Sequence, residues 1–154
     1  MQEFNPLGTH TVCQVAVVVD DIAAYAKRYA RLLGMPVPEV RQTGPAEQTR
    51  ILYRGQPTEG RAKLAFFQAG PQLAIELIEP VGGPSIWREH LDEHGPGVHH
   101  IAFRVPDMDR AVANLADEDM PVAQSGHFAG GRYAYIDSVR QLGVMLELLA
   151  HDDR

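Results

Sequence analysis

The sequence contains two copies of one pattern, and this duplication constrains the fold more than any other feature. Residues 14–19 (QVAVVV) and 100–105 (HIAFRV) place apolar side chains at every second position, as half-buried strands do. Later in the two copies, Gly60 corresponds to Gly131, and residues 73–78 (LAIELI) correspond to residues 144–149 (VMLELL), at a constant separation of 71 residues. Such self-similarity predicts two tandem structural units.

Each copy continues from its first strand into an amphipathic helix. Apolar residues recur at spacings of three and four across 22–33 and 108–115, with Asp20 or Asp21 and then Asp107 as candidate N-caps. Two or three antiparallel strands follow in each half. We therefore predict one pseudo-symmetric domain over residues 1–154, with module one at about 10–80, a linker helix at about 84–95 and module two at about 97–150. About fifteen extra residues of module one fall within residues 38–59, where residues 51–53 form a candidate short strand.

Composition excludes several classes of protein. A chain of 154 residues with 45% hydrophobic residues can bury a sizeable core, and a single cysteine excludes an internal disulfide. The formal net charge of −6 disfavours a nucleic-acid or anionic membrane surface, and no apolar run reaches the roughly 20 residues that span a bilayer. The first residues show no basic and apolar leader. A cytoplasmic protein is expected.

Polar side chains occupy equivalent positions in the apolar strands of the two copies. Gln14 corresponds to His100, and Glu76 corresponds to Glu147. A buried carboxylate without a partner costs several kcal/mol, so two at symmetric sites need an explanation. Either each glutamate faces solvent or pairs with an arginine such as Arg104, or the four side chains converge on one divalent metal ion. An imidazole, two carboxylates and an amide oxygen suit Zn, Ni, Co, Mn or Mg.

Three motifs in the chain resemble the vicinal oxygen chelate superfamily, which includes glyoxalase I, methylmalonyl-CoA epimerase, extradiol dioxygenases and bleomycin-resistance proteins. They are residues 75–80 (IELIEP), 97–103 (GVHHIAF) and 143–148 (GVMLEL), and the first two are most similar to the epimerase branch. The resemblance implies an α+β fold with two tandem βαβββ modules that form a curled mixed sheet around a cavity. It also implies metal ligation by Gln14, Glu76, His100 and Glu147.

Two departures from the epimerase pattern bear on the chemistry. Gln14 stands where epimerases and bacterial glyoxalases usually carry histidine, whereas animal-type glyoxalase I has glutamine there. Without that histidine, Fe(II) oxygenase chemistry is disfavoured. The strand that carries an extra glutamate base in the epimerases reads RAKLAFF at residues 61–67 and holds no acid. Epimerisation by two opposed carboxylates is therefore in question.

The resemblance predicts a metal-dependent isomerase or epimerase-like enzyme with enolate chemistry on a small acyl-CoA or related α-acidic carbonyl substrate. Glu147 or Glu76 would carry the proton. The alternatives are a glyoxalase I-type lactoylglutathione lyase and a metal-free, drug-sequestering binding protein with an aromatic cavity. Candidate lining residues for that cavity are Phe66, Phe67, Trp87, Phe128, Tyr133 and Tyr135. A homodimer is expected, because pairing between chains covers open sheet edges.

The remaining histidines and the basic residues have simpler interpretations. His99 faces away from His100 in a regular strand and is interpreted as a packing or hydrogen-bonded residue. His90 and His94 are expected in solvent, and His127 is expected in a loop away from the cavity. The basic run is expected to be a solvated surface, with phosphate or carboxylate binding as the alternative. It consists of Arg50, Arg54, Arg61 and Lys63.

Overall fold

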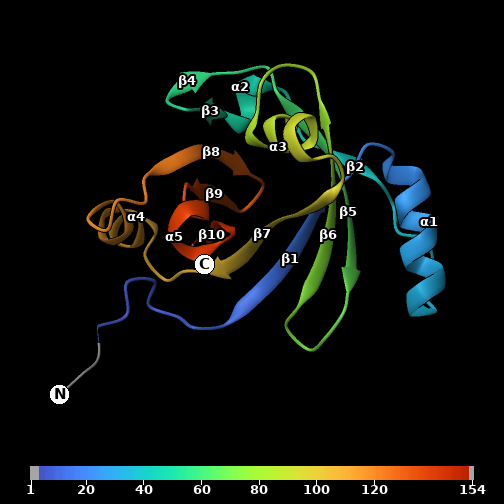
Figure 1. Ribbon diagram of the computed structural model, residues 1–154, viewed down its shortest axis with the longest axis horizontal. Helices are drawn as coiled ribbons and strands as arrows, with labels where there is room; N and C mark the ends of the chain where they lie inside the picture. The colour runs from blue at the N-terminus through green and yellow to red at the C-terminus, as the bar shows by residue number, and fades with distance from the viewer. Residues whose placement is uncertain (1–3, 153–154) are drawn as a thin grey trace.

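The computed structural model describes residues 4–152, and its central feature is one curled, mixed sheet of ten strands (Figure 1). Module one contributes β1 (Val12–Val18), β2 (Arg41–Gln42), β5 (Arg61–Gln68) and β6 (Ala74–Val81). Module two contributes β7 (Gly97–Arg104), β8 (Val122–Phe128), β9 (Gly131–Ile136) and β10 (Met145–His151). The sheet curls into a half-barrel, so the predicted α+β fold is confirmed.

The strand order shows the predicted symmetry. It is β2-β5-β6-β1-β7-β10-β9-β8, followed by the short strands β3 (Leu52–Tyr53) and β4 (Gln56–Pro57). β1 runs parallel to β6, and β7 runs parallel to β10. The two modules join through the antiparallel pair β1–β7 at the centre of the sheet. Module pairing therefore takes place within one chain.

The segment that the sequence marked as an insertion connects the two edges of the half-barrel. It begins with β2, which pairs with β5, and continues through α2 (Ala46–Thr49). It ends with the hairpin of β3 and β4, in which β3 pairs with β8 of module two. The predicted short strand at residues 51–53 is thus confirmed as β3. Figure 1 shows the segment running along one end of the curled sheet.

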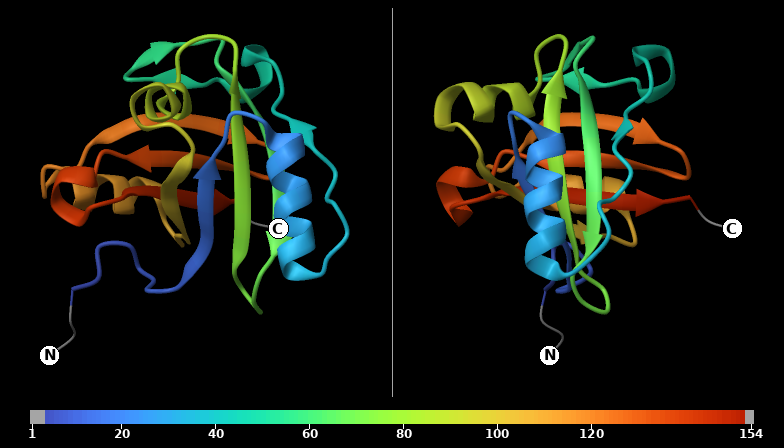
Figure 2. Two further views of the ribbon diagram at one scale, coloured as in Figure 1. Left: turned by 45° about the vertical axis from the view of Figure 1, so that its right-hand side comes forward. Right: turned by 90° about the vertical axis from the view of Figure 1, so that its right-hand side faces the viewer.

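Helices cover the outer side of the sheet where the sequence places apolar stripes. α1 (Ile22–Leu33) packs on β5 and β6 through Ile22, Ala26 and Ala30, and α4 (Met108–Ala116) packs on β9 and β10 (Figure 2). Asp21 and Asp107 accept hydrogen bonds from backbone N–H groups in the first turns, which confirms both as N-caps. The short helix α5 (Val139–Leu142) follows β9 and ends at Gly143.

The predicted linker helix is α3 (Ile86–His94), which begins after the N-cap Ser85. Its first turn buries Ile86 and Trp87 among residues from both modules, including Ile78 and Tyr135. α3 therefore does more than connect the modules, because it closes part of the interior with an aromatic side chain. No helix in residues 4–152 is long and apolar enough to cross a membrane.

Candidate metal centre

The four side chains singled out by the repeat lie on the four central strands of the sheet. Glu76 is on β6, Gln14 on β1, His100 on β7 and Glu147 on β10, which are neighbours in that order. Their registers form two rows across the sheet: Ala16 is opposite both Glu76 and His100, and Ala102 is opposite both Gln14 and Glu147. The small alanine in the middle of each row leaves room for the longer side chains to converge.

All four side chains are buried, with exposed fractions between 0% for His100 and 6% for Gln14 and Glu76. His100 Nε2 lies 3.4 Å from Glu147 Oε1 and 3.6 Å from Glu76 Oε1. Three of the polar atoms have no hydrogen-bond partner: Gln14 Oε1, Glu76 Oε1 and His100 Nε2. Buried polar atoms are nearly always paired, so three orphans in one place need an explanation. Neither glutamate faces bulk solvent, and Arg104 is exposed instead of pairing with them.

The distances from His100 Nε2 to the two carboxylates are near those between neighbouring ligands of one cation. Two donors that each lie about 2.0–2.2 Å from one ion, at tetrahedral or octahedral angles, are roughly 3.0–3.5 Å apart. The two distances from His100 Nε2 are close to this range. Within residues 4–152, no group of three or more His, Cys, Asp or Glu side chains is placed so that it could hold a metal ion as it stands. The residue types suit a divalent cation, and metal binding stays a prediction.

Burial and mutual repulsion control the protonation of this centre. Burial raises the pKa of Glu76 well above its ordinary value, and the nearby charge of Glu147 raises it further, while a hydrogen bond from Gln14 acts in the opposite direction. Burial also raises the pKa values of Tyr133 and Tyr135, so both phenols are neutral hydrogen-bonding groups near neutral pH. A divalent cation would balance the two carboxylates in charge.

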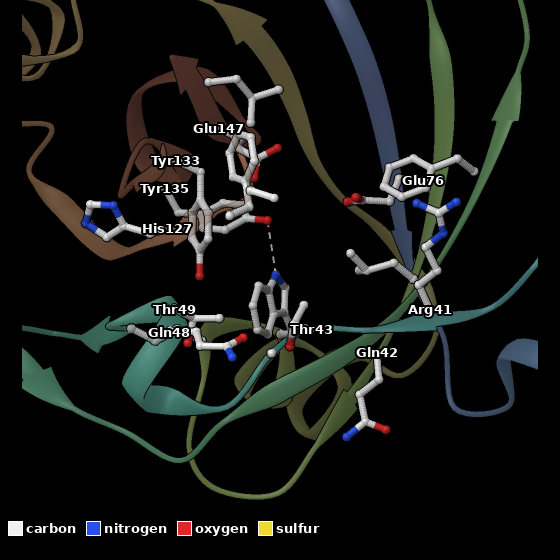
Figure 3. A pocket seen from close by; sticks show the side chains of 18 of the residues that line it. Arg41, Gln42, Thr43, Gln48, Thr49, Glu76, His127, Tyr133, Tyr135 and Glu147 are labelled. Atoms are coloured by element: carbon white, nitrogen blue, oxygen red, sulfur yellow. Dashed lines mark hydrogen bonds between the residues drawn. The ribbon is translucent and has the colours of Figure 1, made fainter. Parts of the chain in front are cut away.

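The centre opens into a cavity of about 760 Å³, into which Glu76 and Glu147 project (Figure 3). Aromatic side chains form much of its wall, and a hydrogen bond of 3.2 Å from Trp87 Nε1 to the Tyr135 hydroxyl fixes two of them. Polar residues of the inserted segment, including Arg41, Thr43 and Gln48, lie on another side (Figure 3). A buried polar centre at the base of a largely aromatic cavity is typical of small-molecule sites.

Residues 13–135 match the sequence profile of the Glyoxalase/Bleomycin resistance protein/Dioxygenase superfamily. The chain belongs to this superfamily. It is 31% identical over 101 residues to the uncharacterised protein YqjC of Bacillus subtilis, covering 64% of this chain and 71% of that one. A further match, 36% identical over 70 residues to a formate-dependent phosphoribosylglycinamide formyltransferase of Azotobacter vinelandii, spans only 18% of that enzyme.

Solved structures of the superfamily share the fold. Methylmalonyl-CoA epimerase from Mycobacterium tuberculosis superposes with a TM-score of 0.63 at 21% identity, covering 92% of this chain and 88% of that one. Hypothetical protein BH1468 from Bacillus halodurans gives 0.68 at 19% identity, covering 94% and 96%. A single-site variant of the Streptomyces coelicolor epimerase, in complex with 2-nitronate-propionyl-CoA, gives 0.63 at 21% identity, covering 92% and 94%.

Some cavity residues of this superfamily member differ from the sequence interpretation. Phe67 does not line the cavity, because it lies on the outer face of β5 against Tyr29 of α1. His127 does line it, on β8, a strand whose weak apolar alternation gave no sequence signal. Arg41 also lines the cavity and was missed, since nothing in the polar segment around it predicts a direction for its side chain. The other proposed aromatic residues line the cavity as expected: Phe66, Trp87, Phe128, Tyr133 and Tyr135.

The basic run is divided among internal contacts. Arg54 forms a paired interaction with Glu89 of α3, Lys63 lies 3.3 Å from Glu79, and Arg61 donates to the Thr43 carbonyl. These contacts hold the inserted segment and β5 to their neighbours. Arg41, 75% exposed at its side chain and beside Glu39, is the cationic side chain that lines the cavity.

Proposed function

We propose that this chain is a metal-dependent isomerase that moves a proton at the carbon next to a carbonyl group, in a small acyl-CoA or related α-acidic compound. The observation that carries the proposal is the group of three unpaired buried atoms on Gln14, Glu76 and His100, with Glu147 completing the donor set. A divalent cation held there supplies Lewis-acid polarisation of a substrate carbonyl, which makes the adjacent proton acidic.

The chain's own residues supply the remaining parts of the reaction. A carboxylate of Glu76 or Glu147 takes the α-proton and returns it, and the pseudo-symmetry of the site makes both residues candidates for the base. The aromatic wall excludes water from the reacting carbon, which strengthens electrostatic interactions inside the cavity. The neutral Tyr133 and Tyr135 hydroxyls, also in the wall, are donors available to substrate oxygens.

The size and charge of the cavity support a substrate that is larger than its reacting group. A volume of about 760 Å³ lies within the range of small-molecule sites. Arg41 provides a positive charge for an anionic part of the substrate. The Streptomyces coelicolor epimerase, which has the same fold, is found with a propionyl-CoA derivative. These features favour an acyl-CoA or another α-acidic carbonyl compound with an anionic portion.

We expect proton exchange to exceed inversion of configuration. The wall formed by β5 presents Leu64 and Phe66 to the cavity, neither of which can transfer a proton. With methylmalonyl-CoA in deuterated water, deuterium should enter the α-position faster than the opposite stereoisomer accumulates. Mass spectrometry with chiral separation measures both rates on one sample. Equal rates from the first turnover would show that two opposed bases act, contrary to this expectation.

A glyoxalase I-type lyase is the second candidate, favoured by the donor set itself. Gln14 with two glutamates and one histidine is the combination that the resemblance associates with animal-type glyoxalase I. Loss of the methylglyoxal–glutathione adduct, followed by absorbance, tests this activity under the same conditions as the exchange reaction. If neither reaction exceeds its uncatalysed rate, both assignments fail and the family membership is unaffected.

Metal content distinguishes either enzyme from a metal-free binding protein. Protein purified without chelator should contain about one divalent ion per chain, drawn from Zn, Ni, Co, Mn or Mg. Glu147→Gln should lower that content severalfold, because the amide that replaces the carboxylate is a weaker ligand without charge. Elemental analysis of both proteins is the measurement. Metal absent from both would instead favour a drug-sequestering protein that uses the aromatic cavity alone.

A homodimer also stays a prediction, which the molar mass in solution tests.

A further inference from the structure

A β-bulge brings His99 beside His100. The pairing of β1 with β7 shifts by one residue between Ala16 opposite His100 and Val17 opposite Val98, so His99 is the extra residue. Neighbouring residues of a regular strand point to opposite faces, but a bulge redirects a side chain. The result is that both histidines are buried, with exposed fractions of 5% and 0%, and their rings meet edge to face. The strand is not regular here, so His99 does not face away from His100, while its interpretation as a packing or hydrogen-bonded residue is confirmed.

The contact between the two rings is a hydrogen bond. The Nδ1 atoms of His99 and His100 are 2.8 Å apart, so one of them carries the shared proton. The backbone of Ile86 in α3 is another polar group beside the His99 ring. Its N–H group donates to Gln124 Oε1 at 2.9 Å, so the Ile86 carbonyl oxygen is the atom left to accept from His99.

The direction of the shared proton follows from that second contact. A neutral imidazole has one N–H group and one acceptor nitrogen. If the N–H group of His99 points to the Ile86 carbonyl, Nδ1 of His99 is the acceptor and Nδ1 of His100 is the donor. His100 then carries no proton on Nε2, the unpaired atom that lies between Glu76 and Glu147.

We propose that His99 is a positioning residue, which holds His100 in the tautomer whose Nε2 lone pair faces the two carboxylates. The inference rests on the proposed metal-dependent function, because that lone pair is what a metal ion needs. A protein that uses no metal would favour the opposite arrangement, in which His100 Nε2–H donates to a carboxylate and His99 Nδ1–H donates to His100. The two arrangements place the proton on different nitrogens, so they can be distinguished directly.

The ring of His99 is held from other sides as well. His90 of α3 contacts it edge to face with a centroid separation of 5.2 Å, and Tyr135 lies at 5.9 Å. His90 is itself stacked beside His94 at 5.0 Å, so both α3 histidines have ring contacts beyond the solvation expected of them. This packing restricts the orientation of the His99 ring, and with it the direction of its Nδ1 atom.

The first experiment reads the tautomer in metal-free protein. Nitrogen NMR of the ¹⁵N-labelled chain, with the His100 signals identified from their loss in His100→Gln, should show protonated Nδ1 and unprotonated Nε2 for His100. Protonated Nε2 would overturn the proposal. This measurement uses the unaltered chain, so it also decides the matter if a His99 variant fails to fold.

The second experiment measures metal affinity. His99→Phe keeps the ring and its packing but removes the acceptor, and it should weaken Zn²⁺ binding by about 10–100-fold in calorimetry, the usual effect of losing such a partner. His99→Asn restores an oxygen acceptor near Nδ1 and should recover most of the affinity. His10→Phe, which makes the same change at an exposed position outside this cluster of rings, is the matched control and should leave the affinity unchanged.

The outcomes separate the two proposals. Unchanged affinity in His99→Phe overturns the role of His99 while the metal site stands. An equal loss in His99→Phe and His99→Asn shows that restoring an acceptor near Nδ1 does not restore the affinity, and this also overturns the role of His99. If the unaltered chain binds no Zn²⁺, Ni²⁺ or Mn²⁺, the proposed function fails, and the NMR experiment alone decides the tautomer.

Discussion

Glu76→Gln and Glu147→Gln should both slow α-proton exchange, and only one of them should recover when metal is added to saturation. A carboxylate that acts as the base contributes about 10²–10⁴-fold to the rate, and an amide cannot replace it. A carboxylate that only binds the metal contributes through affinity, so a higher metal concentration compensates for its loss. The variant that stays inactive at saturating metal therefore identifies the base. The measurement is deuterium incorporation into methylmalonyl-CoA at several metal concentrations.

A matched control is Glu118→Gln, which makes the same chemical change at an exposed position after α4. It should exchange deuterium at the rate of the unaltered chain. Full recovery of both site variants at saturating metal would contradict the proposal that one of these carboxylates moves the proton. Loss of folding is not expected to explain a slow rate of Glu76→Gln. Burial and the nearby Glu147 already raise the pKa of the Glu76 carboxyl, so a neutral amide at this buried position is not costly.

The repeat predicted the fold well because the strands and helices follow from short-range patterns in the sequence. Alternation marks the strands, three- and four-residue spacing marks the helices, and Asp21 and Asp107 mark where two helices begin. The same repeat also predicted which side chains come together. Residues at equivalent positions of equivalent strands meet once β1 and β7 pair, and this brings Gln14, Glu76, His100 and Glu147 to adjacent strands.

The parts that the sequence did not predict depend on contacts between distant segments. A β-bulge changes the direction of the His99 side chain. The bulge is a one-residue irregularity in strand pairing, and the apolar pattern of the sequence around it does not show it. Arg41 reaches the cavity because its segment pairs with β5 at one end and with β8 at the other. That path from one edge of the sheet to the other is set by long-range pairing. The unequal spacing of the two copies identified the segment as an insertion and gave no information on its destination.

The two glycines that mark the repeat, Gly60 and Gly131, should each be intolerant of a single added methyl group. A Cβ at Gly60 would lie 2.6 Å from the Pro84 carbonyl oxygen, and one at Gly131 would overlap the Ala150 carbonyl oxygen of β10. Backbone atoms cannot rotate away as a flexible side chain can. Gly60→Ala and Gly131→Ala should therefore each lower the free energy of unfolding by about 3 kcal/mol, at the upper end of the effects of overpacking.

Gly70→Ala is the matched control, because its Cβ would meet only the Leu73 side chain at an ordinary contact distance of 3.5 Å. Substitution at such a compatible position changes stability by less than about 1 kcal/mol, and usually upward. For a chain of this size, 1 kcal/mol shifts the melting temperature by roughly 2–4 °C, so scanning calorimetry should separate the two repeat glycines from the control by about 6–12 °C. Equal melting temperatures would mean that β9 and β10 can separate at Gly131 without cost. The repeat would then have retained these glycines for a reason other than close backbone approach.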